Sequence, residues 1–406
     1  MRQSVDRQTF DEVMVPGSLP GAMIPVRGKG SRLWDQQGRD YIDLAGGSTA
    51  TALGHCHPSL VDALCEQAST LWHLSRNWTH EPALRLAQQL CAASFADRVL
   101  FASSGADANE AALKLARNYA LENYGAEKQQ VIAFKGASHG QSLLTLSLGN
   151  HTQADVPSST LDADIVHLPF NHIAELENTV SGRTCAVIIE PIQADGGVVP
   201  AHPEFLHRAR ELCDQSEALL IFDEVQTGIG RTGQLFAYMH SGVIPDILTC
   251  ARALGGGFPI AAMLTHRHLA NHFPHNGHQA SGAGNPLACR VASRVLELIS
   301  EPAVLQGVHE RHQWLRHELE QINQQLALFQ DIRGEGLLLG AVLSAPWKGR
   351  ANELIQAAQM SGVLIQSAGP DVLRFTPALI IDEDDLALGI ERLTLALQQR
   401  VRQDGG

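Results

Sequence analysis

From about residue 99 onward, the sequence alternates short apolar runs with longer stretches of helical periodicity, and this pattern restricts the fold more than any other feature. Such runs predict strands buried on both faces and joined by helical crossovers, which form parallel sheets covered by helices. The expected strands span residues 99–101, 131–134, 165–168, 186–189, 218–222 and 247–249. The chain is therefore predicted to be an α/β protein.

The two flanks of this region have a different pattern. Residues 32–44 alternate around Gln37-Gly38-Arg39-Asp40, which predicts a hairpin near the start of the chain. After about residue 286 the pattern predicts long helices at 288–300 and 308–326, strands near 337–343 and 372–375, and a helix from 384 to about 400. We predict a large domain at 56–288 with a mostly parallel sheet, and a smaller α+β domain made of 1–55 and 289–406.

Composition excludes several classes of protein. With 406 residues, of which 44% are apolar, the chain is long enough for two or three domains. The 30 basic and 43 acidic residues give a net charge of -13, which argues against nucleic acid and favours a small-molecule partner. No run of eighteen apolar residues and no apolar signal core is present, and the seven cysteines are scattered, so we expect a cytoplasmic protein without a membrane span. His55, Cys56 and His57 form one cluster without a second, so no metal site is expected.

Three segments carry residue types that can bind a ligand. Residues 103–107 join a predicted strand to a helix, where backbone N–H groups can hold a phosphate, although Ser and Asp also cap helices for structural reasons. Asp223 follows an apolar strand and would need a cationic partner such as a protonated pyridine nitrogen, although a helix cap or a buried ion pair explains it equally well. The glycine-rich turn at 253–259 allows close backbone approach, with or without a ligand.

Taken in this order, these segments resemble the class III aminotransferases over nearly the whole chain, and most of all the acetylornithine and succinylornithine transaminases. The resemblance implies fold type I of the pyridoxal-phosphate-dependent transferases, with a large cofactor domain, a smaller domain and pyridoxal 5'-phosphate as cofactor. The matching stretches are residues 28–38, 104–117, 190–193, 223–233, 253–259, 284–288 and 374–375.

The resemblance also implies roles for single residues. Asp223 would pair with the pyridine nitrogen and Gln226 would face the ring hydroxyl, while the amides of Ser104, Gly105 and Ala106 would hold the phosphate. These five residues form the expected cofactor site.

Two more residues imply a partner subunit and a substrate. Ser281 stands where the family has a phosphate-binding threonine from the other subunit, so a homodimer with shared active sites is implied. Arg374 matches an arginine that helps to hold the substrate carboxylate. The expected substrate is an amino acid or amine of ornithine and arginine metabolism.

Arg252 stands where the family has the lysine that bonds covalently to the cofactor and moves the proton in amino-group transfer. An arginine cannot do either, because the guanidinium stays protonated up to a pKa above about 12. Loss of acid–base catalysis alone is worth about 10²- to 10⁴-fold. The only lysines lie at 29, 114, 128, 135 and 348, outside the glycine-rich turn. Ordinary transamination is therefore predicted to be crippled.

Neighbouring motif positions differ from the family as well. Ser138 replaces an aromatic residue that stacks on the cofactor ring, which removes about 0.5 to 1.5 kcal/mol of stacking. Gln141 replaces a carboxylate-binding arginine, and Asp195 replaces the longer acid that pairs with Arg374. Residues 280–284 lack the family's tyrosine. This clustering favours natural divergence over an isolated lysine-to-arginine change in a normal enzyme.

The leading hypothesis is a divergent enzyme that acts by chemistry other than regular transamination. Pyridoxal 5'-phosphate or pyridoxamine 5'-phosphate would then bind without a covalent bond, with Arg252 as an electrostatic clamp on an anionic group. His139 is a candidate acid–base residue, and a structural histidine is an equally good interpretation.

Two other hypotheses stay open. The chain could be a conventional succinylornithine or acetylornithine transaminase, mutated or slow, in which Arg252→Lys would restore turnover. It could also be a non-catalytic homologue that binds a metabolite or an active paralogue, whose phosphate site Ser281 would complete.

Overall fold

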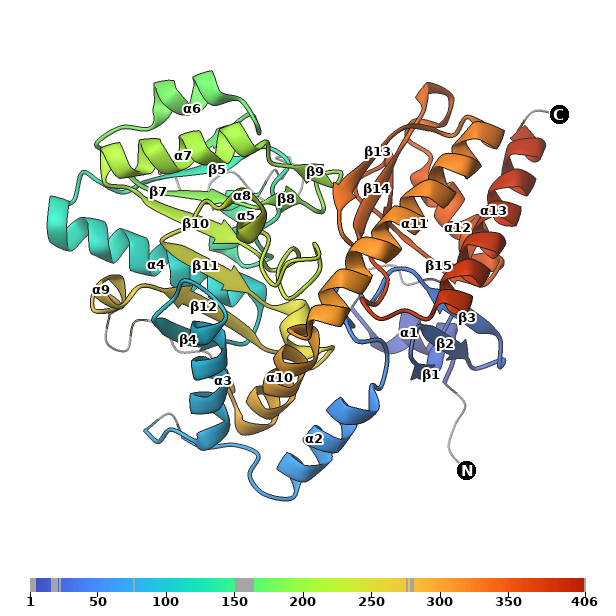
Figure 1. The fold of residues 1–406 in the computed structure, drawn as a ribbon, viewed down its shortest axis with the longest axis horizontal. Helices are drawn as coiled ribbons and strands as arrows, with labels where there is room; N and C mark the ends of the chain where they lie inside the picture. The colour runs from blue at the N-terminus through green and yellow to red at the C-terminus, as the bar shows by residue number, and fades with distance from the viewer. Residues whose placement is uncertain are drawn as a thin grey trace.

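A seven-stranded sheet forms the centre of the computed structural model, which describes residues 5–15, 21, 23–75, 77–149, 164–274, 277 and 281–404. The strand order is β4-β12-β11-β10-β7-β5-β6 (Figure 1). The bounds are β4 (Arg98–Ala102), β5 (Gln130–Phe134), β6 (Ile165–Leu168), β7 (Thr184–Ile189), β10 (Leu219–Asp223), β11 (Ile247–Cys250) and β12 (Ala261–Thr265). All six predicted strands are confirmed, and the α/β fold with them.

Strand β12 is the exception to the parallel arrangement. It pairs antiparallel with both β11 and β4, whereas β11, β10, β7, β5 and β6 run parallel to one another. The sheet is therefore mixed, with its parallel strands in one block.

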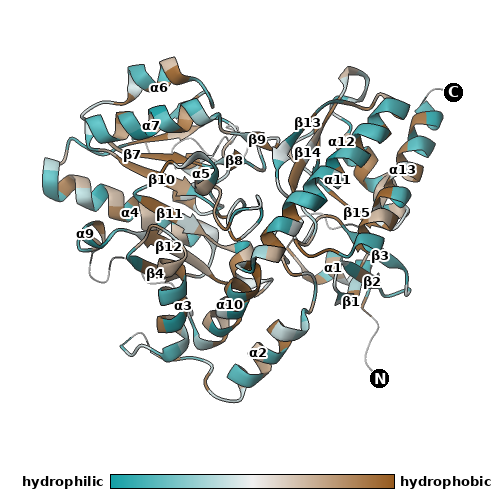
Figure 2. Cartoon of the chain, viewed as in Figure 1, coloured by the Kyte–Doolittle hydropathy of each residue, from teal (hydrophilic) through white to brown (hydrophobic). Residues whose placement is uncertain are grey.

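Helices cover both faces of this sheet because successive strand residues point to opposite sides. In β10, Leu219 and Ile221 pack with α4 (Gly105–Tyr124), while Leu220 and Phe222 pack with α7 (Pro203–Ser216). Figure 2 shows apolar residues concentrated on the strands and polar residues on the outer helix surfaces. Shorter helices complete the layers: α5 (Leu143–Leu148), α6 (Ile173–Thr179), α8 (Tyr238–Ser241) and α9 (Arg267–Ala270).

Two four-stranded sheets lie beside this unit. One has the order β1-β2-β3-β15, and the other has the order β13-β14-β17-β16. The predicted hairpin is confirmed as β2 (Arg32–Asp35) and β3 (Asp40–Asp43) after β1 (Pro25–Lys29). The remaining strands are β13 (Phe329–Glu335), β14 (Leu338–Leu343), β15 (Val363–Leu364), β16 (Gln366–Ser367) and β17 (Val372–Phe375).

Strand β15 connects the N-terminal hairpin to the C-terminal part of the chain. It pairs in parallel with β3, and the register places Val363 opposite Ile42. The helices of this part of the chain are α1 (Arg7–Val13), α11 (Pro302–Leu326), α12 (Ala351–Met360) and α13 (Glu383–Asp404). The helices predicted after residue 300 are thus confirmed.

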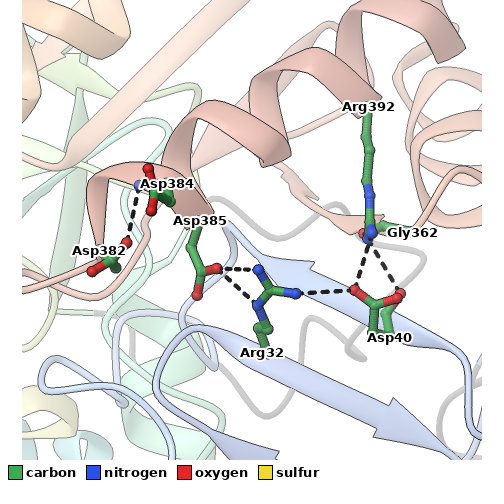
Figure 3. Close-up of polar contacts among 7 residues, drawn as sticks. All are labelled: Arg32, Asp40, Gly362, Asp382, Asp384, Asp385 and Arg392. Carbon is green, nitrogen blue, oxygen red and sulfur yellow. Dashed lines mark hydrogen bonds and ion pairs between the residues drawn. The ribbon is translucent and has the colours of Figure 1, made fainter.

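Ion pairs fix α13 on the hairpin (Figure 3). Arg32 donates from Nε to Asp385 Oδ1 at 2.7 Å, and Arg392 donates to Asp40 Oδ2 at 3.0 Å. Arg32 also reaches Asp40 Oδ2 at 3.5 Å, so the four side chains form one network.

The remaining elements belong neither to these three sheets nor to the helices named above. They are α2 (Pro58–Ala68), α3 (Glu81–Ala92), α10 (Pro286–Ile299), β8 (Ile192–Gln193), β9 (Val199–Pro200) and the 3₁₀ turns η2 (Arg252–Gly255) and η3 (Ala345–Trp347). Helix α10 packs on α2, α3 and η2. Within the described ranges, no helix combines the length and apolar content needed to cross a bilayer.

Candidate functional site

A cavity of about 320 Å³ lies where the parallel strands β5, β7, β10 and β11 end. Open α/β sheets bind ligands at this edge, because the loops after parallel strands converge there. Most of the site residues predicted from the sequence line this one cavity: Ser104, Gly105, Ala106, Ser138, His139, Gln141, Asp195, Asp223, Gln226 and Arg252.

Asp223 forms the centre of what we name the floor of the cavity, together with His139, Asn109 and Thr249. The Asp223 carboxylate is 3% exposed, and its Oδ2 lies 2.7 Å from His139 Nδ1 and 2.7 Å from the donor Asn109 Nδ2. The N–H of Val225 donates to Oδ1 at 3.0 Å. Thr249 in turn donates to Asn109 Oδ1 at 2.6 Å. The amide that holds the Asp223 carboxylate is therefore itself held in orientation by Thr249.

His139 is held by this contact and by its burial. Its Nδ1 carries the proton that the Asp223 carboxylate accepts, and Nε2 is buried without a partner among the described residues. Asn109, which the sequence reasoning gave no role, also donates to the backbone carbonyl of His139 at 2.8 Å. The only sequence signal was an amide side chain inside a helix, where such residues are unfavourable.

The first turn of α4 forms an end of the cavity suited to an anion. The Ser104 side chain caps the helix by accepting from the N–H of Asp107 at 3.2 Å. The N–H groups of Gly105 and Ala106 have no acceptor within the helix, because first-turn amides have none. A Cβ at Gly105 would meet Val225 at 2.8 Å, and one at Gly140 would meet Ala106 at 2.4 Å. Only glycine allows this close packing around the start of α4, whose first-turn amides can hold a phosphate.

Two further polar residues, Gln226 and Glu190, line the cavity. Gln226 donates from Nε2 to Asp195 Oδ2 at 3.2 Å, while its Oε1 is buried without a partner among the described residues. Glu190 accepts the N–H of Ser138 at 2.8 Å, and burial together with the nearby Asp223 carboxylate raises the pKa of Glu190. An unpaired acceptor in a binding cavity fits the ring hydroxyl of the expected cofactor.

A second group of residues, which we name the rim, crosses from the large sheet to the smaller sheets. Arg374 forms a close ion pair with Asp195 and donates to Gln366 Oε1 at 3.0 Å. Gln366 donates to Ser48 Oγ at 2.6 Å, and Arg252 donates to the Ser48 carbonyl. Burial raises the pKa of Asp195, but the Arg374 and Arg252 charges outweigh burial and lower it.

Arg252 begins the 3₁₀ turn η2 with a left-handed φ of +46°. No side-chain carboxylate of the described residues lies within ion-pair distance of its guanidinium, which binds only a carbonyl. Burial lowers the pKa of Arg252. All five lysines of the sequence fall within the described ranges, and none of them lines the cavity.

Ser281 and Arg374 are outside the cavity lining. Ser281 is exposed, its carbonyl accepts from Ser103 Oγ at 3.4 Å, and it lines a neighbouring cavity with Trp78 and His80. Arg374 is 5% exposed behind Asp195. Their assigned roles, in phosphate binding across subunits and in substrate binding, stay predictions.

Comparisons with known proteins cover nearly the whole chain. The family model described as Aminotransferase class-III matches residues 14–397. An acetylornithine/succinyldiaminopimelate aminotransferase of Yersinia pestis is 53% identical over 399 residues, which is 98% of each chain. A succinylornithine transaminase of Yersinia enterocolitica is 52% identical over 405 residues, again 98% of each chain.

Solved structures agree with this likeness. The crystal structure of N-acetylornithine aminotransferase from Stenotrophomonas maltophilia is 41% identical, with a TM-score of 0.85 over 95% of this chain and 98% of that one. The ornithine aminotransferase of Toxoplasma gondii is 27% identical, with a TM-score of 0.92 over 98% of this chain and 95% of that one. The expected fold is confirmed, and the names of the relatives favour the conventional transaminase over the divergent chemistry that the sequence suggested first.

Proposed function

Because the chain belongs to the class III aminotransferases, we propose that it is a slow transaminase that acts on acylated ornithine or a similar amino acid. The observation that carries the proposal is the single cavity that joins Asp223, Gln226 and the start of α4 with Arg252. The first three suit the family's cofactor, and Arg252 limits the rate.

The residues of the cavity fit pyridoxal phosphate in all but the covalent link. The free amides of Gly105 and Ala106 would hold the phosphate, and the buried carboxylate of Asp223 would hold the pyridine nitrogen. The unpartnered Oε1 of Gln226 would accept the ring hydroxyl. When bound, this cofactor supplies the carbonyl and the electron-withdrawing ring on which amino-group transfer depends.

The protein's own part in the reaction is then positioning and proton handling. His139 and Asn109 fix the Asp223 carboxylate, so its charge is preorganised without reorientation during the reaction. Arg252 cannot accept a proton near neutral pH because its guanidinium stays charged. Proton movement at the substrate therefore depends on weaker bases such as water, and turnover is slow.

The decisive experiment is Arg252→Lys in the full-length protein. We expect a rise of about 10²- to 10⁴-fold in amino transfer from acetylornithine to 2-oxoglutarate, because a deprotonatable amine returns to the cavity. Borohydride treatment with pyridoxal phosphate, followed by intact-mass measurement, should give an adduct at position 252 in the variant and no specific adduct in the wild type. Lys135→Arg is the control, and it should leave both results unchanged.

A second candidate function, chemistry other than transamination, is favoured by one observation. Ser138, Gln141 and Arg252 all line the same cavity, so the departures from the family motifs meet at one place. If Arg252→Lys forms the adduct but turnover stays at the wild-type level, this candidate replaces the first.

We propose in addition that two copies form a homodimer in which Ser281 reaches the partner's phosphate site. Ser281 is exposed and lines one cavity with Trp78, an aromatic side chain with a relative exposure of 66%. Sedimentation should show a dimer, and Ser281→Ala should weaken pyridoxal phosphate binding. A monomer with unchanged cofactor affinity would contradict this assignment.

A further inference from the structure

We infer that the Arg252 guanidinium is a binding site for a ligand carboxylate, of an amino acid or a keto acid, within the cofactor cavity. The inference deepens the proposed function and rests on the same cavity. It assigns Arg252 a positive role in ligand selection in addition to its effect on the rate.

Arg252 forms no direct ion pair with a carboxylate of the described residues. Its guanidinium lines the cavity, and among the described residues its one hydrogen bond goes to the neutral carbonyl of Ser48. A guanidinium has five N–H donors, so most of this fork stays available. The Asp195, Asp223 and Glu190 carboxylates favour the charge of Arg252 from a distance, but none of them contacts it directly, so its free donors can pair with an anionic ligand.

Arg374, in the same region, has the direct carboxylate contact that Arg252 lacks, although its Nε is buried without a partner among the described residues. It is paired with Asp195 and also donates to Gln366, so its charge is balanced within the protein. Asp195 attracts Arg252 from a distance but stays bound to Arg374. The two guanidiniums therefore differ in role, and Arg252 is the one that can take up a ligand.

The other acids near Arg252 are already engaged. Asp223 accepts from His139, Asn109 and Val225. Glu190 accepts the N–H of Ser138, and burial beside Asp223 favours its neutral form. Neither acid lies within ion-pair distance of Arg252, so a ligand carboxylate would not displace an existing contact.

The position of Arg252 also compensates for a neighbour. Gln141 lines the same cavity at the place where the family resemblance expects a carboxylate-binding arginine. Arg252 supplies a positive charge to the same cavity. Its planar fork matches a carboxylate with two parallel hydrogen bonds, which a lysine ammonium cannot reproduce.

Glutarate is a suitable probe because it carries carboxylates but has neither an amino nor a keto group to react. We expect calorimetric titration of the full-length protein, saturated with pyridoxal phosphate, to show glutarate binding. Arg252→Gln should weaken that binding by about tenfold or more, the usual effect of losing charged hydrogen bonds. Arg290→Gln removes an exposed arginine paired with Glu66 elsewhere on the surface and should leave the affinity unchanged.

A second anion tests whether the site prefers a carboxylate, and a second variant replaces the first if that one folds poorly. Inorganic phosphate tests whether any anion binds, and phosphate binding tighter than glutarate with the same dependence on Arg252 would overturn the carboxylate assignment. Arg252→Met keeps a long unbranched side chain, and it replaces Arg252→Gln if that variant folds poorly. No glutarate binding by the wild type, or equal binding by wild type and neutral variant, would also overturn it.

The two proposals fail separately. Glutarate binding that depends on Arg252, together with an Arg252→Lys variant that gains no turnover, would leave the carboxylate site standing and remove the transaminase proposal. Restored turnover with glutarate binding unaffected in Arg252→Gln would do the reverse.

Discussion

The floor and the rim of the cavity are built in different ways. On the floor, Asp223 is bound by three donors that come from the ends of neighbouring elements of one sheet and its helix. On the rim, Ser48 and Gln366 meet across 318 positions of sequence, and Arg252 ends at a carbonyl. The contacts of the floor carboxylate thus all lie inside one unit, whereas the rim depends on how two units meet. We propose that the floor recognises the cofactor and that the rim selects the ligand.

The floor should show the largest effect of any single change. Asp223→Ala removes a buried carboxylate and leaves Asn109 and His139 without their acceptor, a change worth about 3 to 5 kcal/mol in buried charge pairs. Pyridoxal phosphate affinity should fall by at least about 10²-fold in an absorbance titration. Asp331→Ala, at an exposed carboxylate, is the matched control. Equal affinity in both variants would remove the distinction between floor and rim.

The free energy of unfolding should depend on pH through Glu224, the residue that follows Asp223 of the floor. Glu224 is fully buried, and burial raises its pKa to about 7 despite hydrogen bonds from the N–H groups of Ala237 and Tyr238. In the unfolded chain Glu224 has its ordinary pKa of 4.5 and releases its proton at a lower pH than in the folded state. Stability from this group is present at low pH and is lost as the pH rises from about 4.5 through 7.

Glu224→Gln, which does not titrate, isolates this effect. The free energy of unfolding of the wild type, relative to the variant, should fall by about 2 to 3 kcal/mol between pH 4.5 and 8. Urea unfolding at several pH values measures it. A difference that stays constant or rises with pH would contradict a raised pKa.

A change on the rim should have a smaller effect on stability and on cofactor affinity. Gln366→Leu removes the link between Ser48 and Arg374 at partly buried positions, and we expect about 1 kcal/mol of destabilisation. Arg374 keeps Asp195, so cofactor affinity should stay at the wild-type level. Thermal unfolding and cofactor titration of the same variant test both parts. A loss of cofactor binding as large as that of Asp223→Ala would show that rim and floor act as one.

The smallest effect is expected far from both regions. Arg32→Ala breaks the contact between the hairpin and α13 that Figure 3 shows, but both partners are partly exposed. Such pairs contribute less than about 1 kcal/mol, and the contribution falls in high salt. Urea unfolding at low and high salt measures it, and a larger, salt-independent loss would contradict a surface role.

The difference between the two regions also explains what the sequence alone could predict. The parallel strands are continuous apolar runs, so their positions follow from local pattern. Strand β12 was missed because its Ala261-Ala262 start follows a glycine-rich turn and lacks β-branched residues. Its antiparallel place between β4 and β11 depends on tertiary pairing, which local pattern does not contain.

The site divides in the same way. Motif resemblance brought Asp223, Gln226 and Arg252 to one cavity, as the structure shows. Ser48 and Gln366 were not predicted, because no periodicity links residues so far apart and neither has unusual chemistry. Glu190 had a usable signal, since a carboxylate after the fully buried strand β7 needs a donor.

The pairing of β15 with β3 sets an order of assembly during synthesis. The backbone edge formed by residues 40–43 pairs with β15, which the ribosome makes more than three hundred residues later. Until then the hairpin exposes an open edge, which is a template for wrong pairing between chains. The early part of this protein is therefore completed last, and a chain that stops before Val363 leaves that edge unprotected.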